Sequence, residues 1–150
     1  MRSLANDSDR QAILERLNSL RPENQARWGS MSPHQMVCHL SDSFKAALGQ
    51  KQVSSSSTLF KRTVYKWAAL WVPLKWPHEV KTRPELDQHL SGSPPTEYSA
   101  DLDGLRSLFD QFCCWPRAYA PHCMFGPMTR GECMRHAYLH MDHHLRQFGA

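Results

Sequence analysis

Long apolar runs are missing from this sequence of 150 residues. No segment approaches the roughly 20 apolar residues that a membrane-spanning helix needs, and residues 1–10 lack the apolar core of a signal peptide. The five cysteines are odd in number and contain no Cys-x-x-Cys pair, which speaks against a disulfide framework and against a thiolate zinc site. We therefore expect a cytoplasmic protein with reduced thiols and without a membrane partner.

The net charge of the chain is also small. The net charge of +4 and the pI near 8.9 favour an anionic small molecule as partner, but they fall short of a dedicated nucleic-acid surface. Apolar residues make up 41% and charged residues 21%, which is typical of globular and not of disordered chains. With no internal repeat and this length, we expect one domain over residues 1–150.

The alternating pattern of β-strands is also absent, whereas apolar residues recur four times at helical spacing. Together these segments predict an all-α fold, a four-helix bundle with a long Pro-rich loop (73–95) between the second and third main helices. The first helix runs from Asp9 to Leu20 with Ser8 or Asp9 as cap, the second from Ser32 to near Gly49, the third from near Ser99 or Asp101 to before Pro116, and the fourth from Thr129 to Phe148.

Two of these helix starts carry a capping box. Ser32 is followed three residues later by Gln35, and Thr129 is followed by Glu132 in the same way. We interpret Glu132 accordingly as a capping residue and not as a general base.

A shorter segment repeats large apolar residues at intervals of four, three and four: Phe60, Val64, Trp67 and Trp71. It predicts a short amphipathic helix with basic residues on its other face. The tryptophans could be stacking platforms for single-stranded nucleic acid, but aromatic residues at helical spacing more often belong to the core. We favour the core.

Nine histidines are many for this length, and five of them lie in the last thirty residues. His140 and His144 lie four residues apart beside the apolar stripe of the last helix, while His136 and His143 fall farther out. On the second helix, His39 sits at the edge of the apolar stripe in the same way. Three imidazoles from facing helices can hold one divalent metal ion and leave a fourth position open. The alternative is a surface histidine pair with His39 as a hydrogen-bonded residue at the core's edge.

Three sequence blocks stand out: Trp28-Gly29-x-Met31-Ser32-Pro33-x-Gln35-Met36-x-x-His39-Leu40, Phe125-Gly126-Pro127-Met128-Thr129, and His140-x-Asp142-His143-His144-Leu145-Arg146-Gln147-Phe148-Gly149. These blocks resemble the DinB-like (YfiT-like) superfamily, and within it a subgroup labelled as a domain of unknown function. The resemblance implies a four-helix bundle, often dimeric, in which His39, His140 and His144 bind the metal. One departure is Cys133, which stands where the subgroup usually has Trp.

Other residues near the ligands have simpler interpretations. Gln35 and Gln147 lie on the ligand side of their helices and could orient an imidazole or a bound water, or they could be solvated residues near helix ends. We expect Asp142 to be a surface or salt-bridge residue. Cys113 and Cys114 end an apolar helix, where we expect buried thiols.

The resemblance implies an enzyme that acts on a small molecule, since several relatives are thiol-dependent transferases or isomerases. A metal-activated thiol would give an S-transferase, and metal-activated water would give a hydrolase. Zinc suits three histidines best, while nickel, iron and manganese also accept imidazole. The alternatives are a bundle that binds a metal or small ligand without catalysis and, less favoured, a DNA-associated stress protein. The small-molecule substrate, a low-molecular-weight thiol and a homodimer are expectations of the same kind.

Overall fold

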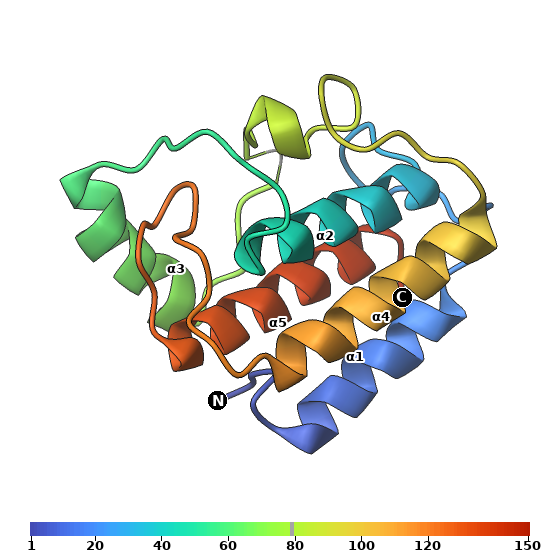
Figure 1. Cartoon of the computed structure of the whole chain (residues 1–150). Coiled ribbons are helices and arrows are strands. Elements are labelled where there is room, and N and C mark those ends of the chain that lie inside the picture. The colour runs from blue at the N-terminus through green and yellow to red at the C-terminus, as the bar shows by residue number, and fades with distance from the viewer. Residues whose placement is uncertain (79) are drawn as a thin grey trace.

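A computed structural model describes residues 1–78 and 80–150 (Figure 1). Over these residues the chain is helical and forms no strand, which confirms the expected all-α fold. Within the described ranges, no helix has the combination of length and hydropathy needed to cross a membrane. Residue 79 of the Pro-rich loop lies outside the described residues. The α-helices are α1 (Asp7–Ser19), α2 (Pro33–Ala47), α3 (Lys66–Trp71), α4 (Tyr98–Cys114) and α5 (Arg130–Gln147); a π-helical turn (Lys61–Tyr65) leads into α3, and a 3-10 turn (Pro84–Leu86) interrupts the long loop.

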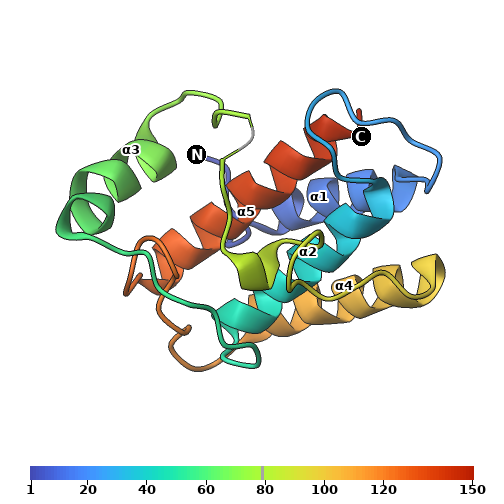
Figure 2. The ribbon, with the colours of Figure 1, turned by 90° about the horizontal axis from the view of Figure 1, so that it is seen from above.

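The apolar stripes of α1, α2, α4 and α5 meet in one core (Figures 1 and 2). Each helix contributes side chains that are almost fully removed from water, and burying one such side chain contributes about 1.5–3 kcal/mol to the hydrophobic free energy of folding. Both α2 and α5 belong to this bundle, and the Pro-rich loop runs over them. Core residues with at most 1% exposure include Ile13, Leu17, Met36, Leu40, Leu105, Phe109, Met141 and Leu145.

Both predicted capping boxes are present. The Ser32 hydroxyl accepts from the Gln35 backbone N–H, the Thr129 hydroxyl accepts from the Glu132 backbone N–H, and each N3 side chain bonds back to the cap. Lys66 adds an ion pair to Glu132 at 2.8 Å, which confirms a structural role for this carboxylate. These boxes fix the starts of the two helices that carry the candidate ligands.

The predicted cap of α1 is wrong, whereas α4 begins one residue before Ser99, the nearer of the two predicted positions. α1 begins at Asp7, and Asp9 accepts from the backbone N–H of Ser3 at 2.8 Å, so its carboxylate fastens the preceding turn and does not cap the helix. α4 begins at Tyr98 because the carboxylate of Glu97 accepts from the next two free backbone N–H groups of the first turn. Glutamate is not among the residues favoured as helix caps, so Glu97 was not predicted as the cap of this helix.

The expectation that Trp67 and Trp71 belong to the core is wrong. Both side chains are exposed, and Leu70 is the buried residue of α3. The helix packs against α5 with a short inner face, and its apolar stripe points outward.

The cap assignments can be tested by comparing Thr129, which caps α5, with Ser8, which does not cap α1. We expect Thr129→Ala to lower the free energy of unfolding by about 0.5–2 kcal/mol, since it leaves a backbone N–H of the first turn without its partner. Ser8→Ala should change it by less than about 0.5 kcal/mol, because Ser8 is an exposed residue that does not cap α1. Urea unfolding followed by circular dichroism measures both, and an equal loss in the two variants would contradict the assignment.

Candidate metal centre

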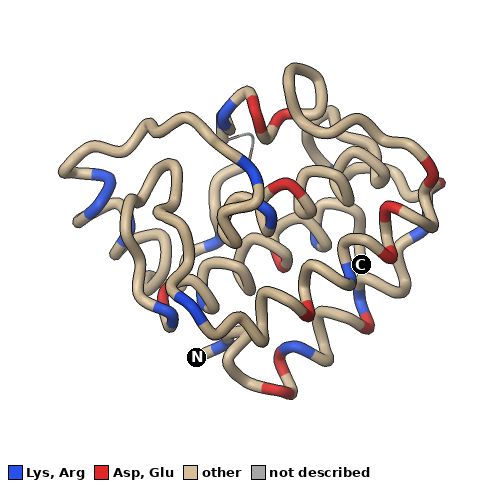
Figure 3. The backbone as a smooth tube through the Cα atoms, viewed as in Figure 1, with Lys and Arg blue, Asp and Glu red and all other residues tan. Residues whose placement is uncertain are grey.

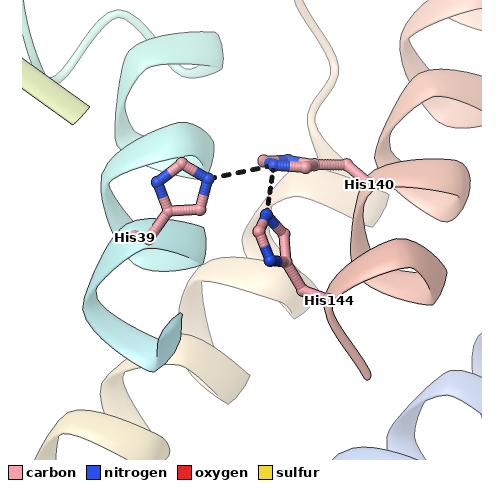
Figure 4. A group of neighbouring side chains, drawn as sticks. All are labelled: His39, His140 and His144. Carbon is pink, nitrogen blue, oxygen red and sulfur yellow. Dashed lines mark hydrogen bonds between the residues drawn. The ribbon is translucent and has the colours of Figure 1, made fainter. Parts of the chain in front are cut away.

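Three imidazoles converge where α2 faces α5. His39 comes from α2, and His140 and His144 come from consecutive turns of α5 (Figure 4). The Nε2 atom of His140 lies 3.0 Å from Nε2 of His39 and 3.1 Å from Nε2 of His144. One donor atom of each ring lies within 4.8 Å of those of the other two, so the cluster could hold a metal ion. The structure thus brings together the three histidines named from the sequence.

These separations are close to those of ligands on one ion. Two nitrogens bound at about 2.0–2.1 Å with tetrahedral geometry lie about 3.3–3.4 Å apart. The observed contacts of 3.0 and 3.1 Å need to widen by only a few tenths of an ångström.

Hydrogen bonds on the far side of two rings fix where their protons lie. Nδ1 of His39 lies 2.7 Å from the backbone carbonyl of Leu86, which can only accept, so Nδ1 donates. Nδ1 of His144 donates to Oε1 of Gln147 at 3.0 Å, and the Gln147 amide is itself oriented by donating to the Trp28 carbonyl at 2.8 Å. In a neutral ring with a proton on Nδ1, Nε2 carries a lone pair. Both rings therefore direct a lone pair toward His140.

Burial keeps all three rings neutral. It lowers the pKa of His39 and, together with the neighbouring imidazoles, brings the pKa of His140 and His144 well below 6.5. A neutral His140 can carry one proton on Nε2, so it can donate to only one of its two close neighbours. The lone pair of the other neighbour is then left without a proton to accept, and a shared cation would give it a partner. The donor set fits a divalent metal for this reason.

A cavity of about 950 Å³ lies beside the cluster, and all three imidazoles line it. Other parts of its wall come from the π-helical turn and α3, including Tyr65 and Ala68, and from the long loop, including Trp76. Cys133 also lines it. The site is thus open on one side to a space large enough for a small molecule.

Two further histidines of α5 lie close to the candidate ligands. His143 is buried, and His136 lines the cavity one turn before His140, with 5.7 Å between the ring centroids. The prediction that both fall farther out is wrong for the buried His143, whereas His136 is intermediate in exposure. The helical count considered only the bundle core. The long loop covers this second face of α5: Trp76 packs over both rings at 5.3 and 6.2 Å, and burial lowers the pKa of His143 to about 4.

His122 was missed altogether. It lies in the Pro-containing segment before α5, where no helical period marks it, and its ring centroid is 4.5 Å from that of His136. Its Nδ1 accepts from the backbone N–H groups of Met124 and Phe125, and burial lowers its pKa to about 4. It adds a further imidazole to the cavity wall beyond the candidate ligands.

Of the remaining predictions for residues near the site, the structure confirms some and contradicts others. Gln147 contacts a ligand ring, whereas the side chain of Gln35 accepts from the Ser32 backbone N–H and so completes a capping box. Asp142 forms ion pairs with Arg16 at 2.7 Å and Arg146 at 2.9 Å, which confirms its structural role. Of the vicinal cysteines, Cys113 is buried as expected, with its pKa raised to about 11 by burial, but Cys114 is exposed.

A second cluster of possible ligands, His34, Cys38 and Asp101, joins α2 to the start of α4. The Asp101 carboxylate already accepts from His34 Nε2 at 2.7 Å and from the Thr96 backbone N–H at 2.9 Å. These bonds, together with that of the Thr96 hydroxyl, account for the cluster as a structural link between the helices. It serves below as a control for the first cluster.

Comparison with known proteins gives one match. The family model described as "Protein of unknown function (DUF1569)" matches residues 1–150. Neither the curated proteins nor the solved structures contain a match to the chain.

The two glutamines provide a matched test of how the cluster is held. We expect Gln147→Leu to weaken zinc affinity by about 10- to 100-fold, because His144 loses the acceptor that fixes its tautomer. Gln147→Glu, which keeps an oxygen acceptor, should retain more of the affinity. Gln35→Leu should leave it unchanged, since this side chain serves the cap of α2. Competition with a chromophoric chelator measures all three, and an equal effect of the two leucine variants would argue against the assigned contact.

Proposed function

The chain belongs to the family of proteins of unknown function DUF1569, and we propose that it is a divalent-metal-dependent enzyme acting on a small molecule. One observation carries the proposal: three neutral imidazoles direct Nε2 atoms at one point, separated by 3.0 and 3.1 Å, on the wall of a large cavity. The resemblance of the motifs to the DinB-like superfamily supports the same function.

His39, His140 and His144 would hold the metal through Nε2. Three imidazoles without a thiolate or carboxylate suit zinc best, and nickel, iron and manganese are the other candidates. When bound, such a cation lowers the pKa of a thiol or a water molecule in the remaining position and supplies a nucleophile at neutral pH. The Leu86 carbonyl and the Gln147 amide hold two of the three rings in the orientation that binding needs.

Residues around the cluster would bind and orient the substrate. His136 and His122 line the cavity and offer imidazole nitrogens for hydrogen bonds. Trp76 packs over the imidazole of His140, with ring centroids 6.3 Å apart, and shields it from water. A low-dielectric surrounding of this kind strengthens every charge interaction inside the site.

The charges of the cavity wall favour an anionic substrate. Arg62, Lys75, Lys81 and Arg83 line it, whereas Asp87 is the one carboxylate among the described lining residues. The volume of about 950 Å³ lies within the range of small-molecule sites. We infer a small organic anion, or a small thiol together with an electrophile, as the occupant.

Two chemistries and one alternative follow from the same centre. A coordinated thiol gives an S-transferase, and a coordinated water gives a hydrolase. Among the described residues that line the cavity, Asp87 is the one carboxylate. The alternative is a bundle that binds a metal or small ligand without turnover. The DNA-associated function draws its support only from the exposed tryptophans and the basic segment beside them.

Metal content is the first test. We expect untagged wild-type protein to bind one divalent ion per chain and His140→Ala to lose it, because the central ring of the cluster is removed. His34→Ala is the matched control in the second cluster and should keep the metal. Elemental analysis after gel filtration measures the content, and circular dichroism shows whether each variant is folded. Full metal retention in folded His140→Ala would exclude the proposed site.

Activity of the loaded protein separates the chemistries. We expect either thiol transfer to 1-chloro-2,4-dinitrobenzene or hydrolysis of p-nitrophenyl acetate, and a loss of at least about 100-fold in His140→Ala. Cobalt-loaded protein provides an independent readout, since a thiol that enters the coordination sphere changes its visible absorption. Metal binding without either activity, over a panel of small thiols and esters, would favour the binding bundle.

A further inference from the structure

The segment from Leu59 to Leu74 exposes an apolar surface that the enzyme function does not use. It begins in the turn before the π-helix, includes α3 and ends just beyond it. Monomeric proteins rarely expose many large apolar side chains side by side, and such patches usually mark a contact with another molecule. The exposed fractions are Leu59 80%, Phe60 62%, Val64 56%, Trp67 60%, Trp71 40% and Leu74 76%; these six residues are called the apolar stripe below.

The inner side of the same segment is anchored to the protein. Leu70 is fully buried, and its backbone carbonyl accepts from Nε of Arg135 at 3.0 Å. Tyr65 and Ala68 line the cavity. Figures 1 and 2 both place α3 at the edge of the molecule, at the end away from α4. The segment is therefore a fixed platform that presents its apolar stripe outward.

Lys and Arg are the only charged residues within the segment that carries the stripe. From Ser43 to His78 the sequence contains six Lys or Arg residues and no Asp or Glu. Figure 3 shows Lys and Arg along the α3 side of the molecule, while many of the Asp and Glu residues gather along α1 and α4. Lys66 is paired with Glu132, but Lys61 and Lys75 form no ion pair among the described residues.

We propose that the apolar stripe docks on the surface of an anionic lipid bilayer. Helices that lie in a membrane interface combine Trp, Phe and Leu on one face with Lys and Arg beside them, and their apolar face sinks about 5–10 Å into the headgroup boundary. An anionic leaflet supplies both the apolar depth for the stripe and the negative charge for the cations. The expectation of no membrane partner rests on the absence of a segment that can span a bilayer, but a helix that lies on the surface needs no such segment.

Two other occupants fit less well. A second copy related by a two-fold axis would bring the same cations of both chains together at the contact, which is repulsive. A nucleic acid matches the charge, but Leu59, Val64 and Leu74 have no ring on which a base can stack. The aliphatic part of the stripe needs an apolar medium, and the bilayer provides one.

Vesicle binding of metal-free protein in EDTA tests the docking independently of the metal site. We expect wild type to sediment with phosphatidylglycerol-containing vesicles and much less with pure phosphatidylcholine. Leu59→Ser should weaken binding several-fold, and Trp67→Ser with Trp71→Ser more than tenfold. Leu90→Ser removes an exposed leucine outside the stripe, 68% exposed, and should leave binding unchanged. Lys61→Gln with Lys75→Gln should weaken it by about tenfold or more, because each cation near an anionic surface contributes about fivefold.

Three results would overturn the proposal. The first is no sedimentation of wild type with anionic vesicles. The second is equal binding by the folded stripe variants and Leu90→Ser. The third is the absence of vesicle binding together with evidence that the stripe binds another partner. That evidence would be a dimer in sedimentation equilibrium that the double Trp variant dissociates, or a labelled oligonucleotide that binds through the stripe.

Discussion

The close approach of three neutral imidazoles between α2 and α5 is the interaction on which the rest of the structure depends. Each ring has lost most of its contact with water, and each keeps a nitrogen lone pair or proton that needs a partner. One proton on His140 cannot satisfy both of its neighbours at 3.0 and 3.1 Å. A shared cation satisfies all three, so the folded chain is arranged for a ligand that its own atoms do not supply.

Much of the surrounding fold can be understood from that requirement. Capping boxes fix where α2 and α5 begin, which sets the turn on which each histidine lies. The long loop returns to α2 and gives the Leu86 carbonyl to His39, while the end of α5 gives Gln147 to His144. The same loop and α3 enclose the space beside the imidazoles. The bundle holds the ligands, and the irregular segments shape the cavity.

The sequence predicted the parts that local chemistry determines. Helical spacing predicted the four core helices, and the capping boxes located the starts of α2 and α5 to the residue. His39, His140 and His144 were found because each lies beside the buried apolar face of its helix. Residues held by tertiary contacts were not predictable: His122 has no periodic signal, His143 is buried by a loop from elsewhere in the chain, and Glu97 caps α4 although glutamate is a poor cap signal. Trp67 and Trp71 have the spacing of core residues but lie outside it, since spacing shows that a face is apolar and not what covers it.

X-ray absorption at the zinc edge of zinc-loaded protein tests the shared cation most directly. The account predicts scattering from three imidazole rings with nitrogens at about 2.0–2.1 Å, plus one light ligand in the open position. A sulfur ligand at about 2.3 Å from a cysteine of the chain, or a zinc ion without imidazole scattering, would contradict it.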